Sequence, residues 1–255
     1  MPLKAIFSAI NYRILIIVLE SFAVYYLYDR YHFTLHIDFT LLSIAIVFPL
    51  VFSITSAYQK RQEAISEFNS FRNKIIELTN IFRAVDGIDQ KNYNKLFKTL
   101  FALQKNLVGV LSQTTNLKIQ DIRNHRKEIF YTLESYKKLY NEREKDSIIR
   151  VKNELFDSVE KLNNLRVHAT PVSLRMYCLI FIYLSPFVYN SHILANFEKN
   201  SNLEFVIALF FSVLIGFILM ALYNIQEYIE DPFDQEGLDD LKFQEMSVGE
   251  EEILS

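Results

Sequence analysis

Apolar and polar positions divide the chain into long alternating blocks. Apolar segments occur at about 14–28, 39–57, 176–194 and 203–223, and a polar region separates the second from the third. Each segment has roughly 15–21 residues, close to the ~20 that a helix needs to cross the hydrocarbon core of a membrane. The pattern predicts an all-α membrane protein with four transmembrane helices in two pairs.

The polar region also has helical periodicity. Apolar residues recur three or four positions apart, as expected for amphipathic helices packed in a bundle. One such set is Leu96, Leu100, Leu103 and Leu107. The periodic stretches are interrupted near Asp86-Gly87, near Thr114-Thr115 and from Asn141 to Asp146.

Two details of this region predict where helices begin and continue. Asp89 or Asn92 is expected to cap the helix that follows the first interruption, because short polar side chains accept hydrogen bonds from free backbone amides. No Pro or Gly occurs between Val51 and Asp86. We therefore expect one helix to run without a break from the second apolar segment into the polar region.

The distribution of charge predicts the topology. Between Lys60 and Arg166 there are 21 basic and 14 acidic residues, whereas the tail from Glu227 onward has 11 acidic residues and one Lys. Basic residues beside membrane helices remain on the cytoplasmic side. The expected organisation is a first transmembrane pair at 1–57, a cytoplasmic helical insertion at 58–170, a second pair at 171–226 and an acidic cytoplasmic tail at 227–255, with both termini cytoplasmic.

The second apolar segment carries a row of bulky side chains at Ile44, Phe48 and Phe52. Residues four apart lie on nearly one face of a helix, and this row would extend over about 12 Å. Two interpretations fit it. The row packs against other helices, or it is repeated around a symmetry axis and forms stacked apolar rings in a pore.

The sequence contains no feature that favours an enzyme. A Gly-rich phosphate loop, a zinc-spaced set of Cys and His, and a Ser/His/Asp pattern in a supporting context do not occur. We therefore expect a protein without enzymatic activity and without a nucleic-acid partner.

Three stretches, in this order, resemble the bestrophin family and its short bacterial branch. The first is Phe52–Glu63, with Tyr58, a basic pair and a glutamate after the second apolar segment. The second is Arg166–Tyr177, which contains the Thr170-Pro171 entry to the third segment. The third is Ile229–Leu241, an acidic stretch around Pro232-Phe233 after the last segment.

This resemblance implies a homopentameric ion channel in a bacterial inner membrane, with further copies of the chain, lipids and small inorganic ions as its partners. It would pass small monovalent ions passively, chloride or other anions in particular. The pore neck would be formed by Ile44, Phe48 and Phe52, and a cytoplasmic constriction by Ile148 or Ile149. Lys60 and Arg61 would lie at the pore mouth, where they attract anions or only satisfy the cytoplasmic preference of basic residues.

The acidic tail has two interpretations. Asp231, Asp234, Glu236, Asp239 and Asp240 occupy the place of a calcium site in eukaryotic bestrophins, and carboxylates are suitable Ca²⁺ ligands. Gly237 and Leu238 interrupt the acidic run, so a solvated tail, or one docked on the basic insertion, is favoured and no cofactor is expected. The alternative to a channel is a membrane-anchored helical scaffold or signalling module that binds a protein partner through its insertion.

Overall fold

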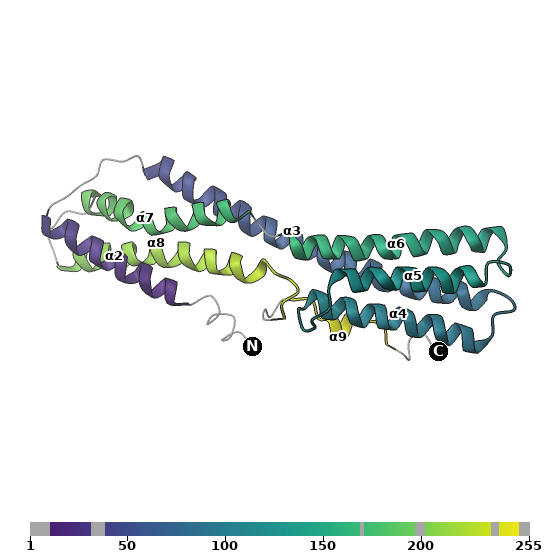
Figure 1. Cartoon of the computed structure of the whole chain (residues 1–255). Coiled ribbons are helices and arrows are strands. Elements are labelled where there is room, and N and C mark those ends of the chain that lie inside the picture. Colours follow the sequence, from purple (N-terminus) through teal and green to yellow (C-terminus); the bar gives the residue numbers. More distant parts are fainter. Residues whose placement is uncertain (1–10, 32–38, 169–170, 197–201, 236–239, 250–255) are drawn as a thin grey trace. The chain divides into compact units, whose positions relative to one another are not determined.

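The computed structural model describes residues 11–31, 39–168, 171–196, 202–235 and 240–249 (Figure 1). These residues form helices joined by turns, and no β-strand occurs among them. The all-α fold class predicted from the sequence is therefore confirmed. The chain divides into two compact units. We call 1–59 with 169–230 the apolar unit, and 60–168 with 231–255 the bundle unit.

Helix α3 (Phe39–Ala84) is continuous over 46 residues and contributes to both units. Its course confirms the uninterrupted helix expected from the absence of Pro and Gly after Val51. Pro49 lies inside this helix, upstream of that stretch.

The apolar unit contains helices α2 (Tyr12–Tyr31), α7 (Val172–Asn196) and α8 (Asn202–Ile229) in addition to the first part of α3. Helix α2 packs against α7 and α8, and these two pack against each other. The approach of α2 to α8 is close at Gly216, where an added Cβ would lie 2.9 Å from the Ser21 hydroxyl oxygen. Glycine at this position therefore allows the two helices to come together.

Not every expected apolar segment is apolar enough to be a membrane span on composition alone. Among the described residues, two stretches are long and apolar enough to cross a membrane. One lies within Glu142–Leu194, and the other is Leu203–Ile229. The expected segment at 14–28 forms a helix that is not among them, and α2 carries Arg13, Glu20 and Asp29. The expected segment at 39–57 contains no charged residue and forms the first part of α3.

The bundle unit contains the rest of α3 and helices α4 (Gln90–Leu111), α5 (Ile119–Ser135), α6 (Glu142–Val167) and α9 (Phe243–Met246). The interruptions predicted near Asp86-Gly87 and Thr114-Thr115 coincide with the α3–α4 and α4–α5 connections. The third, predicted at Asn141–Asp146, is wrong in its position, because α5 ends at Ser135 and α6 already begins at Glu142. Asp89 is the N-cap of α4, and its side chain accepts a 3.1 Å hydrogen bond from the Asn92 backbone amide. Helix α6 begins with a capping box between Asn141 and Glu144, with both hydrogen bonds at 2.9 Å.

The described part of the acidic tail packs into the core of the bundle unit. Phe233, Phe243 and Val248 are buried together with apolar residues of α3 to α6. The rings of Phe68 and Phe243 are 5.1 Å apart. The Gln104 side chain accepts a hydrogen bond from the Val248 backbone amide and donates one to its carbonyl oxygen. The tail therefore docks on the insertion, and apolar side chains rather than charges make the contact.

Candidate functional site

The apolar row of α3 is left exposed by the chain. Ile44, Phe48 and Phe52 are 50%, 57% and 63% exposed, whereas Ile46 and Leu50 on the other face are about 1% exposed. The structure brings the rings of Phe48 and Phe52 together, with centroids 5.5 Å apart and planes tilted by 54°. One face of α3 thus contributes to the core of the apolar unit, and the described part of the chain leaves the face with the predicted neck residues at least half exposed.

Other helices of the apolar unit also expose bulky apolar side chains. Leu19 and Phe22 on α2, and Phe210 on α8, are each more than half exposed. Exposure by itself therefore does not identify a pore, because apolar surface of this kind also suits contact with lipid. The four-residue spacing does not set the α3 row apart either, because Met176, Ile180 and Leu184 on α7 are each about half exposed at the same spacing.

The two candidates for the cytoplasmic constriction have different environments. Ile148 is 3% exposed and belongs to the core of the bundle unit, whereas its neighbour Ile149 is 45% exposed. Both lie in the first half of α6, where consecutive residues point about 100° apart. Of the two, only Ile149 has the surface that an ion path requires.

The predicted pore-mouth residues and the predicted tail residues lie in different parts of the chain. Lys60 and Arg61 lie on α3, are partly buried, and each interacts with another residue of the chain. The Asp231 carboxylate accepts a 3.1 Å hydrogen bond from the Phe233 backbone amide. Glu236 and Asp239 lie outside the described residues, and those that are described contain no group of three or more His, Cys, Asp or Glu arranged to hold a metal.

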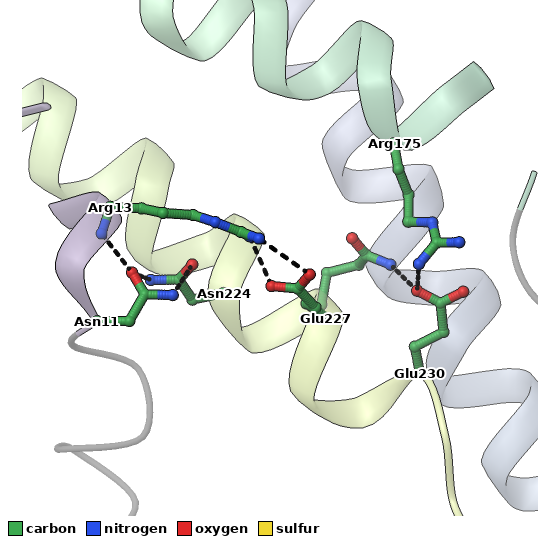
Figure 2. Close-up of polar contacts among 7 residues, drawn as sticks. Asn11, Arg13, Arg175, Asn224, Glu227 and Glu230 are labelled. Atoms are coloured by element: carbon green, nitrogen blue, oxygen red, sulfur yellow. Dashed lines mark hydrogen bonds and ion pairs between the residues drawn. The ribbon is translucent and has the colours of Figure 1, made fainter. Parts of the chain in front are cut away.

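The structure shows a cluster of polar contacts that sequence reasoning missed (Figure 2). The guanidinium of Arg13, at the start of α2, pairs with the carboxylate of Glu227, near the end of α8, at 2.7 Å. Beside this pair, the side-chain amides of Asn11 and Asn224 exchange two hydrogen bonds of 3.0 and 3.1 Å. These contacts fix the beginning of α2 to the last turns of α8.

A second set of contacts in this cluster joins α8 to the first turn of α7. Glu230 is 5% exposed, and its carboxylate lies 3.4 Å from the Arg175 guanidinium and accepts a 3.0 Å hydrogen bond from the Gln226 amide (Figure 2). Burying a carboxylate is costly unless it is paired and hydrogen-bonded, and Glu230 has both kinds of partner. The cluster thus holds the ends of α2, α7 and α8 in register. In the sequence, the local signal of this cluster is a charged residue at one end of each of the three apolar segments.

Comparison with known proteins gives a result at the level of structure. No family profile and no curated protein matches the sequence. Among solved structures, the chain is similar to the bacterial bestrophin homolog from Klebsiella pneumoniae phased with zinc, with 18% identity, a TM-score of 0.74, and coverage of 92% of this chain and 93% of that one. A tryptophan-to-alanine variant of the same homolog gives 18% identity, a TM-score of 0.75, and coverage of 95% and 92%.

These similarities extend over nearly the whole length of both chains. The protein therefore has the fold of the bacterial bestrophin homologs. The resemblance predicted from the three sequence stretches is confirmed at the level of the fold.

Proposed function

We propose that this chain is the subunit of a bestrophin-type ion channel, a homopentamer in a bacterial inner membrane that passes small monovalent anions, chloride in particular. The observation that carries the proposal is the uncovered row of Ile44, Phe48 and Phe52 on a chain with the bestrophin fold. The bestrophin homologs supply the precedent for the fold, and the row supplies the candidate pore lining.

Electrostatics favours a symmetric assembly around this row. An ion inside a low-dielectric protein costs on the order of tens of kcal/mol, so it needs a wet path. A ring of identical subunits provides that path with one helix from each copy, whereas a single chain would have to enclose it alone. In such a ring the exposed face of α3 points to the axis, and its aromatic rings form successive apolar constrictions.

The preference for anions rests on two features. The edge of a Phe ring carries partial positive charge, so Phe48 and Phe52 can present a favourable edge to chloride. Lys60 and Arg61 follow the row along α3 and raise the local anion concentration. We place the cytoplasmic constriction at Ile149, because Ile148 is buried in the core.

The test is the reversal potential of the purified protein in a planar bilayer under a KCl gradient. Current that reverses near the chloride potential is expected, and Phe48→Ala with Phe52→Ala should lower the permeability of Cl⁻ relative to K⁺. Phe22→Ala is the matched control, because Phe22 is 54% exposed in the same unit but lies on α2. Reversal near the K⁺ potential would contradict the anion preference. Absence of current together with a monomeric or dimeric mass would favour the helical scaffold.

A further inference from the structure

A small pocket lies in the bundle unit, formed by the end of α5, the following turn and the first half of α6. Its volume is about 70 Å³. Phe130, Leu133 and Ile149 contribute apolar walls, and three lysines, Lys137, Lys145 and Lys152, surround them. This combination of apolar floor and positive rim resembles the way in which proteins bind small amphipathic anions.

The positive charges of the pocket are only partly compensated. Lys137 pairs with Glu134, the one acidic residue of the lining. The Lys145 ammonium is 3.9 Å from the carboxylate of Glu142, a side chain that is 90% exposed. An exposed pair at this distance contributes little.

Lys152 has the environment most favourable for an added anion. Its ammonium lies 5.1 Å from the centre of the Phe130 ring, and it has no ion-pair partner within the described part of the chain. Burial lowers the pKa of Lys152, as does the nearby Arg126, while the carboxylate of Glu134 acts in the opposite direction. An anion beside Lys152 would offset both effects, because it stabilises the ammonium form.

We propose that this pocket binds a short-chain carboxylate. The carboxylate lies against the Lys152 and Lys145 ammonium groups, and the hydrocarbon part contacts Phe130, Leu133 and Ile149. A volume of this size holds roughly five water molecules, or a ligand of a few non-hydrogen atoms. The apolar walls favour a carboxylate with a hydrocarbon tail over an inorganic anion of the same charge. The site shares Ile149 with the proposed cytoplasmic constriction, but its occupancy can be measured without ion conduction.

Butyrate is the probe for the test, with butylamine as its cationic counterpart of similar size. Binding to the purified full-length protein in detergent is measured by saturation-transfer NMR and titration calorimetry. We expect butyrate to bind and butylamine not to bind. Lys152→Gln should weaken butyrate binding about tenfold, because a charge-assisted contact is lost. The affinity should also fall as pH rises through the pKa of Lys152, since only the ammonium form attracts the carboxylate.

Lys161→Gln is the matched control. Lys161 lies on the same helix but pairs with Glu67 and Asp157, away from the pocket, so this change should leave the affinity unaltered. Phe130→Ala provides a second variant if Lys152→Gln loses helicity, because Phe130 is 42% exposed and its loss removes one wall. The site is disproved by equal binding of butyrate and butylamine, by absence of butyrate binding, or by well-folded variants that retain the original affinity.

Discussion

The apolar unit and the bundle unit differ in the surfaces that they leave exposed. Both bury an apolar core, but α2, α3 and α8 of the apolar unit also expose large apolar side chains along their outer faces. In the bundle unit many exposed positions are charged, and ion pairs such as Lys74–Glu154 and Arg123–Glu160 connect neighbouring helices. Burial of a core therefore does not distinguish the two units. Their outer faces do, because exposed apolar side chains suit lipid and exposed charged side chains suit water.

The largest effect is expected from breaking the core of the bundle unit. Phe82 is fully buried and packs edge-on against Tyr136 with ring centroids 5.6 Å apart. Phe82→Ala should destabilise the protein by about 3–5 kcal/mol, because it removes buried area and leaves a cavity. Thermal unfolding followed by circular dichroism measures this loss. Phe52→Ala, at an exposed position, should shift the same transition far less. Equal shifts would contradict the difference between the buried core of the bundle unit and the exposed row of the apolar unit.

A smaller effect is expected at the polar cluster of the apolar unit. Glu230→Ala removes a buried carboxylate and leaves Arg175 and Gln226 without this partner, so it should cost about 2 kcal/mol. Glu227→Ala is the control, because the Glu227 side chain is 41% exposed and its pair with Arg13 should contribute at most about 1 kcal/mol. The midpoints of thermal unfolding in detergent compare the two variants. A larger loss of stability for Glu227→Ala would show that the pair of Glu227 with Arg13 stabilises the cluster more than Glu230 does.

The docked tail offers a test within the bundle unit. Gln104→Leu removes both hydrogen bonds to the Val248 backbone and should cost about 1–2 kcal/mol. Hydrogen exchange should become faster at 241–249 while the core of α3 remains protected. Gln90→Ala, on the exposed start of the same helix, serves as the control. Unchanged exchange in the tail of Gln104→Leu would show that the apolar anchors hold the tail without the glutamine.

The smallest effect concerns the surface ion pairs of the bundle unit. Hydrogen bonding with Arg123 lowers the pKa of Glu160 below its ordinary value of 4.5. A depressed carboxyl pKa stabilises the fold fully above the ordinary value, and this contribution is lost as pH falls through the lower pKa of the folded protein. Arg123→Gln should therefore lower the unfolding midpoint slightly at pH 7 and not at all in strong acid. A difference that persists in strong acid would mean that Arg123 acts through packing instead, and Lys127→Gln controls for loss of charge on α5.

Much of the local structure follows from sequence because its causes are local. The apolar spacing placed the helices of the insertion, and the polar residues at Asp89 and Asn141 mark two of their beginnings. The motifs around Tyr58, Thr170-Pro171 and Pro232-Phe233 indicated the bestrophin fold, which the solved structures support. Each of these signals depends on residues within a few positions of one another.

The tertiary structure decided what local patterns leave open. Arg13 and Glu227 are 214 positions apart, and Gln104 and Val248 are 144 apart, so no periodicity predicts that they meet. The sequence offered Ile148 and Ile149 as equivalents, and helix packing buried one and exposed the other. The sequence alone determined the helices and several of their ends, because hydrogen bonding and side-chain period act over a few residues. Only the packed structure decided which faces meet, because that choice depends on the fit of surfaces from distant parts of the chain.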